Sequence, residues 1–279
     1  MVILAYLKLI RWPILLLIAA IQFSIRYFLI APMIGVNGFE LIMTDREFGY
    51  LVLATLLIAG GGHAINDYFD AKIDRINKPK TAVLDRLIKR RVAMALHAIL
   101  SGSGILIASY LSYKMGMWKM SALFIFVIFS LWIYSTQLKN QLLIGNLLIA
   151  LLAGFVPLIV GLYEIPLLNA SHPDALTEVG DSLFNAPAFW IIGYSCFIAL
   201  FTLAREITKD VIDLRGDKYY DFNTLPIALG IPRTKGILIF IYLVIGAAIT
   251  WIYSNFFVGY SDLLSACSLA ILVILFIQI

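Results

Sequence analysis

Long hydrophobic runs alternate with short polar segments along almost the whole chain. A helix that crosses a membrane needs about 20 mainly apolar residues, and eight runs come close to that length. They predict helices at residues 14–31, 50–65, 92–112, 118–135, 142–163, 186–204, 236–254 and 263–279. No polar domain interrupts the series, so the pattern predicts one all-α domain over residues 1–279, a polytopic membrane helical bundle.

The composition agrees with a membrane protein and limits the classes of partner. Of the 279 residues, 62% are hydrophobic and 14% are charged, whereas a soluble domain carries roughly 45–50% apolar and about 25% charged residues. A pI near 9.0 would suggest nucleic acid in a soluble protein, but here we expect the bilayer as partner and no nucleic acid. Cys196 and Cys267 lie in apolar runs without a CxxC pattern, which argues against a disulfide framework or a zinc site.

The basic residues indicate which helix ends face the cytoplasm. If the spans alternate in direction, all of the 21 Lys and Arg residues except Arg26, Arg46, Lys114 and Lys119 fall on one side. Lys and Arg concentrate in cytoplasmic loops. We therefore expect an integral protein of the cell's inner or plasma membrane, with a cytoplasmic N-terminus and cytoplasmic loops after the second and sixth spans. The segment 164–185 lacks Lys and Arg, as expected of an exterior loop.

Both of those cytoplasmic loops carry three aspartates at the same spacing. The first reads NDYFDAKID at residues 66–74, and the second reads REITKDVIDLRGD at residues 205–217. Spacings of three and four place side chains on one face of a helix, where like charges repel unless a cation binds. Carboxylates suit Mg²⁺, which typically takes one or two of them and completes its shell with water and substrate phosphates. The predicted metal-binding and catalytic residues are Asp67, Asp70, Asp74, Asp210, Asp213 and Asp217.

Solvated loop charges are the alternative explanation for these aspartates. A single DxxD would fit that explanation equally well, but two matching triplets at the ends of apolar spans favour a functional site. Interleaved basic residues such as Arg205 and Lys209 could clamp a diphosphate. Glu206 is expected to pair with Arg205, and His63, four residues before Asp67, is expected to have a structural role.

The two acidic segments resemble the paired motifs of the UbiA superfamily of intramembrane prenyltransferases. Residues 66–74 match its NDxxDxxxD motif, and residues 213–217 match its DxxxD motif. The resemblance extends to residues 11–13, residues 74–79, the Tyr134–Ser135 pair, Lys139 and Asn146, and so covers nearly the whole chain. Because the family usually has nine helices, we expect a bundle of eight or nine transmembrane helices.

This resemblance implies a Mg²⁺-dependent prenyltransferase that moves an isoprenoid group from a polyprenyl diphosphate donor to a membrane-associated acceptor. Aromatic faces of Tyr68, Phe69 and Tyr134 could stabilise an allylic cation. The residues expected to bind the diphosphate and the prenyl chain are Asn66, Arg75, Lys78, Tyr134, Lys139, Asn146, Arg205 and Lys209.

The acceptor stays open between two chemical classes. Residues 205–217, followed by NTLPI at residues 223–227, are most similar to the branch that prenylates the lipid geranylgeranylglyceryl phosphate. Aromatic acceptors (hydroxybenzoate, naphthoate or homogentisate) are the alternative. A membrane transporter with intramembrane carboxylates is the rival from a different class, although transport sites tend to lie near the bilayer midplane and these aspartates lie at helix ends.

Overall fold

The computed structural model describes residues 2–77, 79, 83–175 and 182–257. Within these residues all regular structure is helical, apart from an isolated bridge between Leu84 and Ile88. In chain order the helices are α1 (Val2–Leu9), α2 (Trp12–Ser24), the π-helix η1 (Ile25–Ile30), α3 (Ala31–Gly35), α4 (Asp45–Asn77), α5 (Arg90–Lys114), the 3₁₀ turn η2 (Trp118–Met120), α6 (Ser121–Thr136), the 3₁₀ turn η3 (Leu138–Asn140), α7 (Ile144–Ser171), the 3₁₀ turn η4 (Pro173–Ala175), α8 (Asn185–Ile212), α9 (Leu214–Tyr219), α10 (Leu225–Leu229), α11 (Ile231–Ile252) and the π-helix η5 (Tyr253–Phe257).

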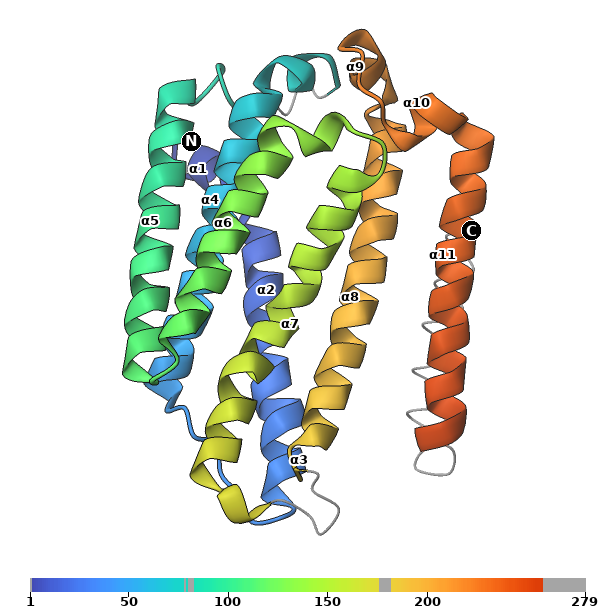
Figure 1. The fold of residues 1–279 in the computed structure, drawn as a ribbon. Coiled ribbons are helices and arrows are strands. Elements are labelled where there is room, and N and C mark those ends of the chain that lie inside the picture. The colour runs from blue at the N-terminus through green and yellow to red at the C-terminus, as the bar shows by residue number, and fades with distance from the viewer. Residues whose placement is uncertain (1, 78, 80–82, 176–181, 258–279) are drawn as a thin grey trace.

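Seven helical segments among the described residues are long and apolar enough to cross a membrane, and they stand side by side as a bundle (Figure 1). They are Trp12–Gly35, Asp45–Asn77, Arg90–Lys114, Trp118–Thr136, Ile144–Ser171, Asn185–Ile212 and Ile231–Phe256. Each contains most or all of one of the first seven predicted runs, which confirms the polytopic helical bundle. The eighth predicted span, at residues 263–279, lies outside the described residues.

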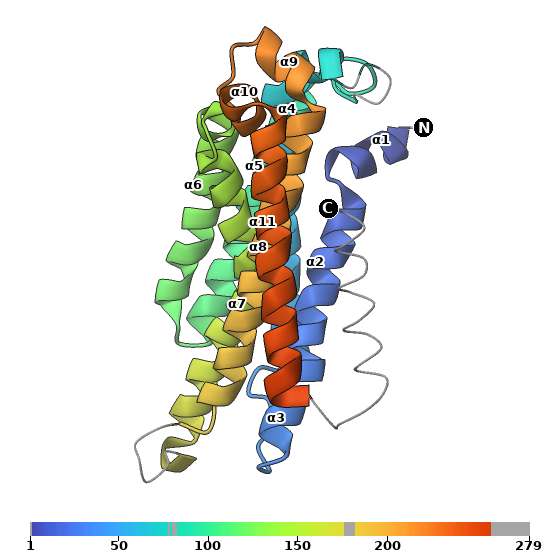
Figure 2. The ribbon, with the colours of Figure 1, turned by 90° about the vertical axis from the view of Figure 1, so that its right-hand side faces the viewer.

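The polar connections divide between the two ends of the bundle. The C-terminal end of α4, the link from α6 to α7, and α9 and α10 lie at the same end as α1 (Figure 1). In the perpendicular view, α1 lies across the bundle axis at this end (Figure 2). We call it the basic end, because its connections hold most of the Lys and Arg residues. The structure thus confirms that the spans alternate as the charge pattern predicts.

Close packing of α4 against its neighbours depends on two positions that lack a side chain. A Cβ atom at Gly61 would lie 2.5 Å from Ser101 Oγ on α5, and one at Gly62 would lie 2.8 Å from Leu131 Cδ1 on α6. Small residues let helices in membranes approach closely. The glycine triplet at residues 60–62 therefore brings the helix that bears the first acidic segment against both α5 and α6.

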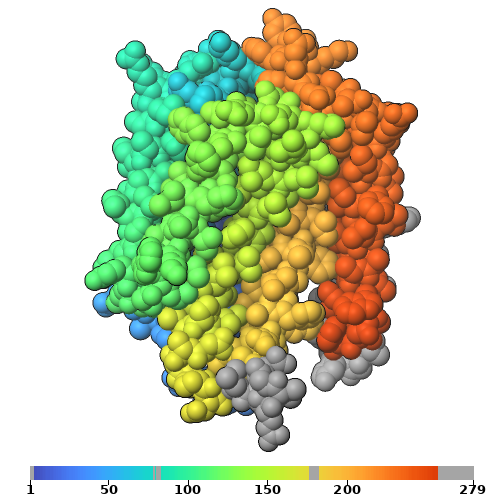
Figure 3. Space-filling view, in the orientation of Figure 1, coloured from blue at the N-terminus to red at the C-terminus, as the bar shows by residue number. Residues whose placement is uncertain are grey.

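The outer face of the bundle is apolar, as expected of a surface that contacts lipid. The space-filling view shows α6, α7 and α11 covering one flank (Figure 3). Large side chains on these three helices are exposed, among them Phe126, Phe129, Leu151 and Phe240. Contiguous apolar surface of this kind is rare on soluble monomers.

Two helices extend beyond their predicted ends, and each extension corrects the sequence-based interpretation. The first acidic segment was predicted as a loop but forms the last turns of α4, where Ala71 is buried in a small core. Glu164 was predicted to begin the exterior loop, yet it is completely buried within α7. A buried carboxylate requires a partner, and Arg26 on η1 provides one at 2.8 Å.

Candidate active site

The two acidic segments meet at the basic end of the bundle. The first lies on α4, and the second crosses a break in the helix at Asp213, between α8 and α9. The Oδ1 atom of Asn77, the last residue of α4, accepts a hydrogen bond from the backbone N–H of Gly216 at 2.8 Å. A Cβ atom at Gly216 would lie 2.5 Å from the Asn77 side chain, so this contact depends on glycine. The bond fixes α4 directly against α9.

The carboxylates of the two segments influence one another electrostatically. Asp213 and Asp217 are buried, with 8% and 6% of their surfaces exposed. Burial, followed by the negative charges of Asp210, Asp213 and Asp70, raises the pKa of Asp217 to about 7. Asp70 belongs to the first segment, whereas Asp210, Asp213 and Asp217 belong to the second. The two acidic segments therefore lie close enough to interact electrostatically.

The first segment is held by cations and an amide from elsewhere in the fold. Arg11, the residue before α2, pairs with Asp67 at 3.0 Å. Lys139, in the link between α6 and α7, pairs with Asp70. Asn66 Nδ2 also donates to Asp70 Oδ2, at 2.9 Å. The position of Lys139 agrees with its predicted role beside the acidic motif.

The second segment has a different set of partners. Asn146 Nδ2 on α7 donates to Asp210 Oδ2 at 2.7 Å. The expected ion pair between Arg205 and Glu206 is present at 2.6 Å, and Lys209 also approaches Glu206, at 3.5 Å. Glu206 therefore holds two basic side chains at the edge of the site.

Several predicted residues do not join this cluster. Arg75 is exposed and pairs with Asp85 at 2.7 Å, in the connection that follows α4. The rings of Tyr68 and Phe69 pack edge to face on each other. The Phe69 ring centroid lies 6.0 Å from Lys139 Nζ, but neither ring lines the cavity described below. Lys78 lies outside the described residues. The role of each predicted site residue in binding or catalysis stays a prediction.

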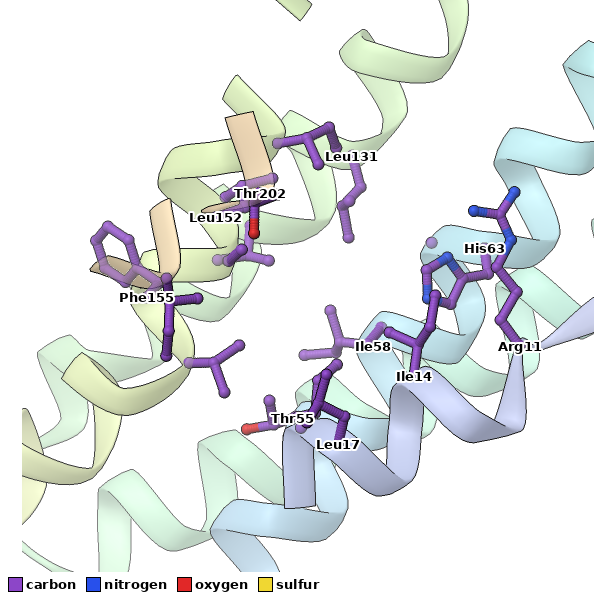
Figure 4. A pocket seen from close by; sticks show the side chains of 18 of the residues that line it. Arg11, Ile14, Leu17, Thr55, Ile58, His63, Leu131, Leu152, Phe155 and Thr202 are labelled. Carbon is purple, nitrogen blue, oxygen red and sulfur yellow. The ribbon is translucent and has the colours of Figure 1, made fainter. Parts of the chain in front are cut away.

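A cavity of about 240 Å³ opens beside the acidic cluster and descends between α2, α4, α6, α7 and α8. Its polar mouth contains Arg11, His63, Asn66, Tyr134, Arg205, Glu206 and Lys209. Below the mouth the walls are almost entirely apolar, and Figure 4 shows Ile14, Leu17, Ile58, Leu131, Leu152 and Phe155 around the space. An apolar chamber with a charged entrance suits an amphiphilic ligand whose polar end stays at the mouth.

Sequence reasoning missed two polar groups of the mouth. Arg11 was assigned no role in the site, although its position directly before the Trp12–Pro13 start of α2 places it at a helix end on the basic side. Glu206 is the one carboxylate in the cavity lining among the described residues, and nothing in its spacing distinguishes it from its acidic neighbours. His63 reaches the cavity, but its Nε2 atom is buried and bonds to no described residue.

The donor set fits a divalent cation that shares its coordination with a substrate. Within the described part of the chain, no group of three or more acidic, His or Cys side chains forms a ready-made metal cage. Burial and the negative charges of Asp210, Asp213 and Asp70 nevertheless raise the pKa of Asp217, and a bound cation would offset this effect. Mg²⁺ needs only one or two protein carboxylates when phosphates and water supply the rest.

Comparison with known proteins assigns the family. The model of the UbiA prenyltransferase family matches residues 29–279. Digeranylgeranylglyceryl phosphate synthase from Methanosarcina mazei is 30% identical over 234 residues, which cover 81% of this chain and 71% of the relative. The synthase of the same name from Methanothrix thermoacetophila is 37% identical over 177 residues, 63% of this chain and 57% of the relative, which is less than two thirds of its length.

A solved structure supports the fold. It comes from work on digeranylgeranylglyceryl phosphate synthase in membranes and superimposes with a TM-score of 0.63, covering 99% of this chain and 87% of that one at 22% identity. The shared helical architecture and the family match over most of the chain agree with the paired acidic motifs at the basic end. The chain therefore belongs to the UbiA prenyltransferase family.

Proposed function

We propose that this protein transfers a prenyl group from a polyprenyl diphosphate to geranylgeranylglyceryl phosphate, with Mg²⁺ as cofactor and the active site at the cytoplasmic face. One observation carries the proposal: carboxylates from two distant segments lie beside the polar mouth of an apolar cavity, where the lining residues Arg11, Asn66 and Lys209 contact or adjoin them. A prenyl diphosphate has the same division, with an apolar chain and a charged end that binds metal. The similarity to synthases that carry the name of the lipid product supports the acceptor.

In this proposal the position of each residue determines its role in binding and stabilising the diphosphate. Asp70, Asp210, Asp213 and Asp217 hold the metal-bound diphosphate, with Asp67 and Asp74 beside them. Bound Mg²⁺ supplies positive charge that stabilises the departing diphosphate without proton transfer. Lys139, Arg11, Arg205 and Lys209 add fixed positive charge around the leaving group.

The cavity then directs the reacting carbon toward the acceptor. The apolar walls hold the chain, so that its C1 atom lies at the mouth beside Tyr134. The aromatic face of Tyr134 stabilises the allylic cation that forms as the C1–O bond breaks. An acceptor hydroxyl forms a new bond to C1 and loses its proton, and diphosphate leaves. Because the acceptor is a lipid, it reaches the mouth from the same bilayer.

The test is transfer of labelled geranylgeranyl diphosphate by the purified full chain in detergent, with and without EDTA. Geranylgeranylglyceryl phosphate, hydroxybenzoate, dihydroxynaphthoate and homogentisate serve as alternative acceptors. We expect product only with geranylgeranylglyceryl phosphate, loss of product in EDTA, and loss in the Asp67→Ala and Asp213→Ala variants. Asp174→Ala, at the opposite end of the bundle, is the matched control and should keep its activity.

Other outcomes separate the alternatives. Coupling to an aromatic acceptor alone would overturn the lipid assignment and retain prenyl transfer. If neither coupling nor diphosphate release occurs with any donor, while labelled solute accumulates in proteoliposomes, the transporter interpretation replaces the enzyme.

A further inference from the structure

The lining of the cavity has a deep end, which we call its floor, as well as a mouth. On α4 its lining extends from Asn66 at the mouth to Thr55 at the deep end, a separation of about 16 Å at the α-helical rise. The lining on α2, from Arg11 to Ile21, covers a similar length, and so does the lining on α6, α7 and α8. This depth is roughly half of the ~30 Å hydrocarbon core of a bilayer.

A single buried amide joins three helices at that depth. Gln22 on α2 is completely buried. Its Nε2 atom donates to Thr55 Oγ1 on α4 at 3.2 Å and to the Val156 carbonyl on α7 at 3.5 Å. Thr55 and Val156 line the cavity, and Gln22 does not. Figure 4 shows Thr55 at the lower edge of the space, on the side away from His63. Gln22 thus lies directly behind the cavity wall.

This amide is not what stability alone would favour. The Oε1 atom of Gln22 is buried and accepts no hydrogen bond from the described residues. An unpaired buried amide oxygen disfavours folding, and a leucine of similar size would avoid that penalty. Polar side chains at membrane depth are candidates for a functional role. A role in shaping the cavity therefore explains Gln22 better than a role in stability does.

We propose that Thr55, backed by Gln22, forms a stop that limits the length of the prenyl chain the cavity accepts. This inference rests on the proposed function. With the diphosphate held at the acidic cluster, the far end of the chain meets Thr55. Beyond it lies the closely packed core that includes Phe48, Leu51 and Val52. Donor length is then set by the distance between the acidic cluster and the Gln22–Thr55 pair.

The test compares farnesyl, geranylgeranyl and farnesylgeranyl diphosphates as competing donors. The double variant Gln22→Ala/Thr55→Ala removes roughly the volume of one isoprene unit at the floor. We expect the ratio of product from farnesylgeranyl diphosphate to that from geranylgeranyl diphosphate to rise about tenfold, the scale at which apolar pockets discriminate chain length. Thr55→Leu places a larger side chain at the deep end of the cavity. It should increase the share of product formed from the shorter donor, farnesyl diphosphate.

A matched control separates chain length from general loosening. Ser112 on α5 and Tyr163 on α7 also form a buried hydrogen bond between helices, at 2.6 Å, outside the cavity lining. Ser112→Ala should leave the donor ratio unchanged. An unchanged ratio in both floor variants, with transfer intact, would overturn the length stop and leave the proposed function standing. Absence of transfer by the unaltered protein would overturn the proposed function instead. If the double variant does not fold, Thr55→Leu decides the question alone.

Discussion

Charged side chains lie within the helical bundle at both of its ends, but the two groups differ in how their charges balance. At the end opposite the basic end, Arg26 and Glu164 form a buried ion pair with exposures of 1% and 0%. Arg26 also donates to the Met43 carbonyl, and the Phe48 ring lies 4.7 Å from its guanidinium carbon. Glu164 accepts the backbone N–H groups of Ile42 and Met43. Arg26 therefore meets one buried carboxylate, Glu164, and the exposed Asp45 at 3.7 Å, and the backbone supplies further partners.

At the basic end, carboxylates instead crowd together. Asp70, Asp210 and Asp213 surround Asp217 closely enough to raise its pKa. Burial is common to both groups and so does not distinguish a site from a structural pair. The proximity of several carboxylates to one another does distinguish them, because a bound cation relieves the repulsion between like charges. Four predictions test this contrast.

The largest effect is expected from Asp70, the residue that brings the first acidic segment into the shared site. Asp70→Asn keeps the shape but removes the charge, and we expect kcat/KM for prenyl transfer to fall about 10³-fold, as for loss of a group that stabilises developing charge. Asp85→Asn is the matched control, because that carboxylate pairs with Arg75 and Arg90 away from the cavity. Equal activity of both variants would contradict a joint site.

The ion pair of Arg26 with Glu164 should contribute to the stability of the protein and not to its catalytic activity. Glu164→Gln leaves the Arg26 charge buried without its carboxylate, which should lower the free energy of unfolding by about 3 kcal/mol or more. Denaturation in detergent measures this loss, and activity per folded molecule should stay within about twofold. Loss of activity in a variant of unchanged stability would assign a direct functional role to this pair.

The raised pKa of Asp217 at the basic end should make the stability of the metal-free protein depend on pH. The folded state raises the pKa of Asp217 to about 7 from an ordinary value of 3.8, so it holds this proton more tightly than the unfolded state. The resulting stabilisation is present at low pH and is lost as the pH rises through about 7. In EDTA we expect unfolding to be harder at pH ~6 than at pH ~8, by about 1 kcal/mol. Asp217→Asn should remove most of that difference.

The smallest effect is expected at Arg75. The sequence predicts that it binds diphosphate, whereas its guanidinium is exposed and pairs with Asp85. Surface pairs of this kind contribute about 0–1 kcal/mol, so Arg75→Ala should change both KM and stability little. Lys139→Ala, which removes the partner of Asp70, should raise the KM for donor at least tenfold more than Arg75→Ala does. If the KM for donor rose equally in the two variants, Arg75 would bind the diphosphate as the sequence predicts.

The sequence predicts well what depends on local pattern. Apolar runs locate the seven described spans, and the charge pattern places both acidic segments at one end. Contacts between distant residues are different in kind. The pair of Arg26 with Glu164 joins positions 138 residues apart, and the effect of Asp70 on Asp217 depends on how α4 meets α9. Helix tilt and rotation decide such contacts, and periodicity does not specify them.

The floor at Thr55 also has a consequence for the membrane in which the protein works. In the proposed reaction, a donor chain that stops at Thr55 is taken from one leaflet, and the finished lipid returns to that same leaflet. New lipid would then accumulate on one side of the membrane only. Equal growth of both leaflets requires a separate protein that moves lipids across, and the rate of that movement sets an upper limit on how fast the membrane can expand.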